Sequence, residues 1–213
     1  MPPRNPMRER AKAQMPMVLL TLLSILQALA IELLWAHVRE TGYLIEPGWT
    51  ALLAWVQIGT TLLGVLLIWL LYSSMVMRFR WVPSTSDSLY PFGIGILQFV
   101  MIAALGPEWL GYWFVTLGVL FGFTSAALQI VLRRARLDGE NDEWFANIAP
   151  ATVRDFYPVI AVVALLIGIG IALHASGHQG PFALVGLLVA TAALGYQMYL
   201  NHLVWQRSVR QED

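Results

Sequence analysis

Six long apolar segments, separated by short polar stretches, dominate the sequence. Each is close to the roughly 20 residues that an α-helix needs to cross the hydrocarbon core of a bilayer. The pattern therefore predicts an all-α integral membrane protein with six transmembrane helices. The predicted spans lie at about 17–38, 50–74, 90–106, 109–132, 157–174 and 181–204.

The basic residues predict how these spans are oriented. If the N-terminus is cytoplasmic, Arg39 is the only one of the 13 Lys and Arg residues on the outer side. Cytoplasmic loops of membrane proteins carry an excess of Lys and Arg. The pattern thus predicts that both termini are inside (N-in/C-in), which agrees with an even number of spans.

The lengths of the connections predict which spans are neighbours. A short connection makes consecutive helices pack as an antiparallel hairpin. We therefore expect three hairpins, formed by spans one and two, three and four, and five and six. The short outer connections are residues 39–49, 106–109 and 175–181.

The remaining polar segments lie on the predicted cytoplasmic side. They are a basic N-terminal tail (1–16), a loop (133–156) inside the transmembrane domain (17–206), and a C-terminal tail (207–213).

The loop 133–156 combines acidic and aromatic residues. Such an amphipathic segment predicts a short helix at the inner membrane surface, and its acidic-aromatic patch is a candidate docking site for a partner protein. The patch comprises Asp138, Glu140, Asp142, Glu143, Trp144 and Phe145.

Composition narrows the class of protein further. Only 12% of the residues are charged and 58% are hydrophobic, whereas soluble domains carry about 25% charged residues. The composition therefore predicts one integral domain in a lipid bilayer. We expect the protein to be located in a cell membrane, in particular in a bacterial inner membrane. The formal net charge of zero indicates no nucleic-acid partner. The absence of cysteine excludes disulfides, thiolate metal sites and a cysteine nucleophile.

Glu32 is the one acidic or basic residue within the predicted spans. A carboxylate inside a membrane costs a few kcal/mol, so it usually faces a partner or a water-filled path. Three interpretations remain open. Glu32 hydrogen-bonds a neighbouring helix and holds the bundle together, it binds or relays a cation or proton, or it contacts another subunit.

Small and polar residues form stripes on the even-numbered spans. Gln57, Thr60 and Thr61 share one face of span two, and similar stripes in spans four and six contain Gln129 and Gln197. Such stripes serve close helix packing, in which amides and hydroxyls hydrogen-bond across the seam. The alternative is a polar transport path that also includes Glu32.

The histidines near the predicted outer surface are candidate metal ligands. His174 and His178 have the spacing of one helical turn, and His37 and Glu40 are three residues apart. Such a set suits a divalent ion, but the sequence around His178 is typical of a turn. We therefore predict no metal site. No pair of histidines in mid-membrane is available to bind haem, and we predict no cofactor.

These observations favour a small membrane transport protein, a channel or carrier for an ion or small solute. No catalytic motif is present, so an enzyme is disfavoured. The alternative is a non-catalytic membrane subunit or assembly factor that docks a partner through the acidic-aromatic loop. A third class is an intramembrane enzyme acting on lipid or quinone. Self-association is compatible with all three.

Overall fold

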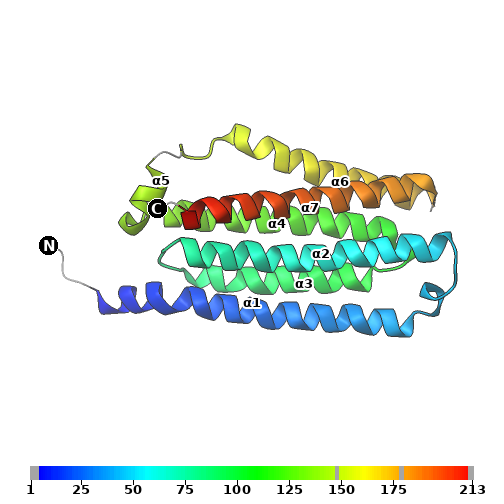
Figure 1. Ribbon diagram of the computed structural model, residues 1–213, viewed down its shortest axis with the longest axis horizontal. Coiled ribbons are helices and arrows are strands. Elements are labelled where there is room, and N and C mark those ends of the chain that lie inside the picture. Colours follow the sequence, from blue (N-terminus) through cyan, green and yellow to red (C-terminus); the bar gives the residue numbers. More distant parts are fainter. Residues whose placement is uncertain (1–4, 147–148, 178–179, 211–213) are drawn as a thin grey trace.

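The computed structural model describes residues 5–146, 149–177 and 180–210, and this part of the chain is helical without strands (Figure 1). The long helices are α1 (Pro6–Glu40), α2 (Trp49–Arg78), α3 (Leu89–Ala103), α4 (Leu110–Ala135), α6 (Tyr157–Ser176) and α7 (Pro181–Arg210). The short elements are α5 (Asp142–Phe145) and the 3₁₀ turns η1 (Gly42–Leu44), η2 (Thr85–Ser88), η3 (Pro107–Trp109), η4 (Gly139–Asn141) and η5 (Val153–Phe156).

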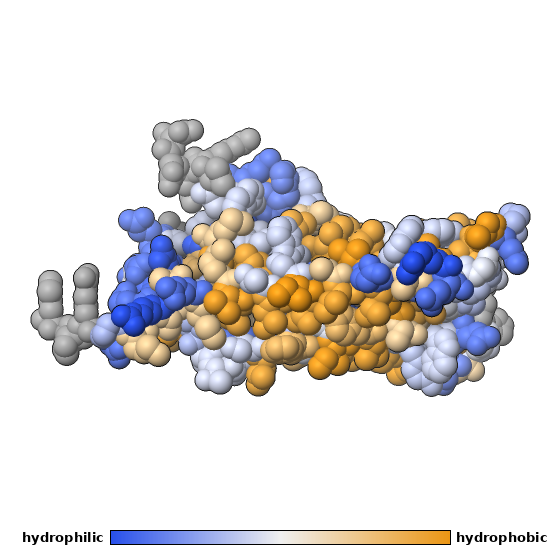
Figure 2. Space-filling view, turned by 90° about the horizontal axis from the view of Figure 1, so that it is seen from below, coloured by the Kyte–Doolittle hydropathy of each residue, from blue (hydrophilic) through white to orange (hydrophobic). Residues whose placement is uncertain are grey.

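The prediction of six spanning helices is confirmed. Within the described ranges, six helices are long and apolar enough to cross a membrane. The surface supports the same conclusion, because Figure 2 shows hydrophobic side chains across the middle of the molecule and hydrophilic ones gathered towards its two ends. The chain is thus a multi-pass membrane protein.

The helix ends follow from local chemistry. The Asn5 side chain accepts hydrogen bonds from the amides of Met7 and Arg8, which caps α1 well before its apolar part begins. Gly177 ends α6 with a φ of 62°, a left-handed conformation that glycine adopts without steric cost. Gly106, with a φ of 118°, similarly allows the sharp turn between α3 and η3.

Figure 1 shows the six long helices running side by side, with α1 beginning and α7 ending at the same end of the bundle. We call this the N/C end. Helix α1 packs against α2 and α3, α3 packs against α4, and the most extensive contacts join α4 to α6 and α2 to α7. By contrast, α6 and α7 touch each other little, although they are consecutive in sequence. Figure 1 shows α6 leaning away from α7 towards the N/C end.

The tight packing of α4 on α6 depends on two glycines. A Cβ atom added to Gly111 would lie 2.7 Å from the carbonyl oxygen of Gly170, and one added to Gly170 would lie 2.6 Å from the carbonyl oxygen of Gly111. The two backbones are therefore in direct contact, a mode of packing that small residues permit in membranes. Beside this contact, Trp113 and Phe114 of α4 are fully buried in the centre of the bundle.

Candidate functional site

Gln57 is buried and belongs to the helix framework. Its side-chain amide donates to the carbonyl oxygen of Ala104 at 3.4 Å, and its side-chain oxygen accepts from the amide of Gly106 at 3.0 Å. Both partners lie in the turn after α3, where the helix leaves carbonyl groups without intrahelical partners. Gln57 therefore satisfies buried backbone groups of this turn that have no helical partner, and it is not available to a solute.

The two threonines that follow on α2 also link helices. Thr61 accepts a hydrogen bond from the indole nitrogen of Trp113 on α4 at 3.0 Å. The hydroxyl of Thr60 lies 2.6 Å from that of Thr191 on α7. Both threonines are fully buried. For Gln57, Thr60 and Thr61 the helix-packing interpretation of the stripe thus accounts for every polar group.

A buried amide pair between α1 and α3 was not singled out from the sequence. The Gln98 side chain donates to the side-chain oxygen of Gln27 at 3.1 Å, and both residues are buried. Gln27 lies on a different face of α1 from Glu32. This position was the feature of the sequence that could have indicated a polar contact between α1 and another helix. The second polar atom of each amide, Gln27 Nε2 and Gln98 Oε1, is buried without a partner in the described chain.

Glu32 lies on the outward face of α1. It is exposed, as are its apolar neighbours Leu29, Leu33 and Trp35. It makes no ion pair or hydrogen bond with the part of the chain described here. The structure therefore does not bring Glu32 together with the other residues of the predicted path, and it contradicts the interpretation that Glu32 holds this bundle together through a neighbouring helix.

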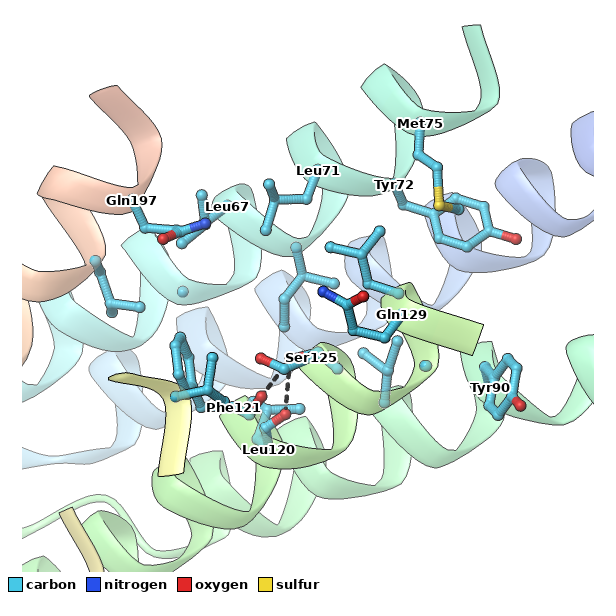
Figure 3. Close-up of a pocket in the computed structure, with 18 of the residues that line it drawn as sticks. Leu67, Leu71, Tyr72, Met75, Tyr90, Leu120, Phe121, Ser125, Gln129 and Gln197 are labelled. Atoms are coloured by element: carbon cyan, nitrogen blue, oxygen red, sulfur yellow. Dashed lines mark hydrogen bonds between the residues drawn. The ribbon is translucent and has the colours of Figure 1, made fainter. Parts of the chain in front are cut away.

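The remaining two path residues line a partly open cavity of ≈ 220 Å³ in the half of the bundle nearer the N/C end. Gln129 reaches it from α4 and Gln197 from α7 (Figure 3). Most of the wall is apolar, as ligand pockets usually are. The other polar residues of the wall are Tyr72, Tyr90, Thr124 and Ser125.

Gln129 and Gln197 each bring a carboxamide group to this cavity. Both are partly buried, and neither side chain has a hydrogen-bond partner within the described residues. The hydroxyl of Thr124, in contrast, donates to backbone carbonyls of its own helix, those of Leu120 at 2.8 Å and Phe121 at 3.1 Å. The site therefore offers two carboxamides, each able to donate and accept, to a solute surrounded by apolar side chains.

The cavity is closed towards the N/C end on the side of α2 and α4. Met75 and Val131, which line it, belong to a buried cluster with Phe79, Trp81 and Ala135. Its wall includes residues of α7 but only one residue of α6, Val159.

The aromatic part of the acidic-aromatic loop packs against its own chain. Phe79, after α2, stacks on Phe145 with 5.4 Å between ring centroids and meets Trp144 edge-on at 5.6 Å. Asp142 and Glu143 remain exposed. A partner would therefore find mainly the acidic part of this patch.

Asp138, the first acidic residue of the loop, is bound to the N-terminal part of α1. Asp138 accepts a hydrogen bond from Lys12 Nζ at 2.6 Å, and both side chains are buried. Burial alone would raise the pKa of Asp138, but the hydrogen bonds from Lys12 and from the amide of Glu140 hold the pKa below its ordinary value. Asp138 is therefore ionised at neutral pH and anchors the loop to α1.

The histidine candidates do not come together in the described residues. His174 contacts the ring of Tyr112, with 4.8 Å between centroids, and His37 lies near Glu40 on α1. The described ranges contain no group of three His, Asp or Glu residues suited to a metal ion. His178 lies outside the described residues.

Comparison with protein-family models, curated proteins and solved structures finds no match to this chain. The class of protein therefore rests on the structure itself, which is that of a multi-pass α-helical membrane protein with six apolar helices.

Proposed function

We propose that this protein is a small membrane transport protein of the carrier kind, and that its solute site is the cavity between α2, α4 and α7. The observation that supports the proposal is the pair of carboxamides, Gln129 and Gln197, which have no hydrogen-bond partner in the described chain and lie in a mostly apolar wall. A carrier needs a site in which a solute exchanges its hydration for protein contacts.

The wall chemistry narrows the class of solute. Among the described residues, no Asp, Glu, Lys, Arg or His lines the cavity, whereas paths for ions use rings of carbonyls or charged side chains. We therefore propose an amphiphilic small molecule with an apolar body and a hydrogen-bonding group. In this proposal the N/C end faces the cytoplasm of a bacterial cell, because Arg39 is the only basic residue that then lies outside.

The absence of cysteine allows a direct test of the carrier mechanism. A carrier exposes its site to each side of the membrane in turn. In proteoliposomes of defined orientation, we expect the cavity variant Ser125→Cys to react with a membrane-impermeant maleimide added from either side. Glu46→Cys, in the exposed connection after η1, should react from one side only.

Two results would contradict the carrier. One is reaction of Ser125→Cys from a single side under all conditions, and the other is no reaction from either side while Glu46→Cys reacts normally. Leu23→Cys, at a fully buried position of α1, measures the background from general loosening of the bundle.

The exposure of Glu32 favours a second candidate, a membrane subunit that associates through α1. A carboxylate on a lipid-facing surface costs a few kcal/mol. In a symmetric dimer the same patch of both copies meets at the axis, so that Glu32 of one copy, in its protonated form, donates a hydrogen bond to the carboxylate of Glu32 in the other copy. Ala28, one turn away and exposed, allows the helices to approach closely. We therefore take a second copy of the chain as the partner.

This candidate predicts a difference between two variants of Glu32. Glu32→Leu should shift the chain from dimer to monomer in nanodiscs, whereas Glu32→Gln, which keeps the hydrogen bond, should remain dimeric. Mass photometry measures the ratio of dimer to monomer. A wild-type chain that is monomeric at every lipid-to-protein ratio would rule the candidate out, and neither variant should alter the reactivity of Ser125→Cys.

A further inference from the structure

Arg78 is a cation near the cavity that has no anionic partner among the residues that the structure describes. It lies three residues beyond Met75, which lines the cavity, so the two side chains project from the same face of α2. Its Nε and Nη2 atoms are buried and have no hydrogen-bond partner in the described chain. Its guanidinium carbon lies 5.6 Å from the centre of the Trp205 ring. The guanidinium is thus held in the protein, and two of its nitrogens are shielded from water.

A line of polar side chains leads from the cavity to this arginine. On α7, Gln197, Asn201 and Trp205 follow each other at intervals of one helical turn. Asn201 donates to the hydroxyl of Ser74 on α2 at 3.3 Å, and Arg78 is one turn beyond Ser74. The seam between α2 and α7 therefore joins the free carboxamide of Gln197 to the guanidinium of Arg78.

Three other basic residues at the N/C end differ from Arg78 because they have acidic partners. Lys12 pairs with Asp138 at 2.6 Å, Arg80 lies 3.8 Å from Glu140, and Arg134 pairs with Asp87.

Arg133 provides a second unpaired cation near the cavity. It is exposed, and it makes no ion pair within the described ranges. It lies four residues beyond Gln129, on the same face of α4. At this level α2 and α4 are neighbours, because Met75 and Val131 share one buried cluster.

We propose that the solute of the cavity is an amphiphile with an acidic head group, its apolar chain in the cavity and its carboxylate or phosphate between Arg78 and Arg133. The inference rests on the proposed function, since it names the substrate class of the same site. Basic pockets between transmembrane helices on the cytoplasmic side suit anionic head groups. A guanidinium binds carboxylates and phosphates through paired hydrogen bonds.

Two photoreactive probes with the same chain test the inference. Decanol and decanoic acid, each carrying a diazirine in the chain, are added at pH 8 to the full chain in nanodiscs of phosphatidylcholine, and labelling is measured by mass spectrometry. We expect the half-saturating concentration of the acid to be at least about tenfold lower than that of the alcohol, because hydrogen bonds to charged groups are strong. Arg78→Gln should remove this preference and leave labelling by the alcohol unchanged. Arg78→Lys should keep part of the preference.

The controls distinguish binding of the head group at Arg78 and Arg133 from a general attraction of the acid to the positive charge of the protein. Arg154→Gln removes an exposed cation of the inner loop and should leave the preference intact, whereas Arg133→Gln, at an exposed position, should reduce it. Decyl phosphate with the same diazirine distinguishes a preference for a carboxylate from a preference for a phosphate. Because the proposed site requires the apolar chain for binding, free inorganic phosphate should compete with neither probe.

The outcomes distinguish the inference from the proposed function. If the alcohol labels the cavity and the acid shows no preference that depends on Arg78, the acidic head group is wrong and the solute site stands. If Arg78→Gln reduces labelling by both probes equally, Arg78 is a packing residue and the inference fails. If neither probe labels the cavity of the wild-type chain, the solute site itself fails.

Discussion

Replacing Gly111 by valine is expected to push α4 and α6 apart and to lower the free energy of unfolding by about 1–3 kcal/mol, the usual cost of overpacking. The first added carbon would lie 2.7 Å from the Gly170 carbonyl oxygen and 3.0 Å from the backbone nitrogen of His174. These are backbone atoms, which cannot rotate away as the end of a flexible side chain can. The strain must therefore be relieved by moving a whole helix.

Gly168→Val on α6 is the matched control for this variant. A Cβ atom at Gly168 meets no heavy atom within 4 Å, so valine there should change stability little. Thermal unfolding in detergent, followed by size-exclusion chromatography, measures the difference. Equal midpoints for the two variants would show that α4 and α6 do not meet through Gly111 and Gly170.

Replacing Ser125 by phenylalanine is expected to weaken labelling of the cavity by the decanol probe strongly. Ser125 lies on α4 in the cavity wall, one turn from Gln129. The larger ring would occupy space that the apolar body of the solute needs, and it would cover the carboxamide beside it. We expect the half-saturating concentration to rise by more than about tenfold, which corresponds to about 1.4 kcal/mol of binding free energy.

Val119→Phe provides the control on the same helix. Val119 is exposed on the outside of the bundle, so a phenylalanine there adds the same ring without entering the cavity. Labelling should match that of the wild-type chain. If Ser125→Phe labels as well as Val119→Phe, the cavity does not hold the probe.

The number of spanning helices was predictable because bilayer thickness sets a minimum length for an apolar helix. The strongest helix pairings were not. They join α4 to α6 and α2 to α7, and they depend on three-dimensional register, such as the contact of Gly111 with Gly170. Helical periodicity shows which residues share a face, but it does not show which other helix that face will meet.

The candidate site was predictable only in part, because helical periodicity shows which residues share a face but not what that face contacts. The small-residue stripes selected Gln129 and Gln197, and the structure places both residues in the wall of one cavity. They also selected Gln57, whose hydrogen-bond partners are backbone groups in the turn after α3. No sequence motif marks these backbone groups, so this role of Gln57 was not predictable. Glu32 was selected by its charge alone, and charge does not distinguish a residue that faces the interior from one that faces outward.

The central claim, that the cavity between α2, α4 and α7 is a solute site, is tested most directly by mapping the decanol photolabel on the wild-type chain. Tandem mass spectrometry of the labelled protein should place the probe on cavity residues such as Tyr72, Met75 and Gln197, with saturation at low probe concentration. Labelling confined to outward-facing residues of α1, such as Leu29 and Leu33, and rising without saturation, would contradict it.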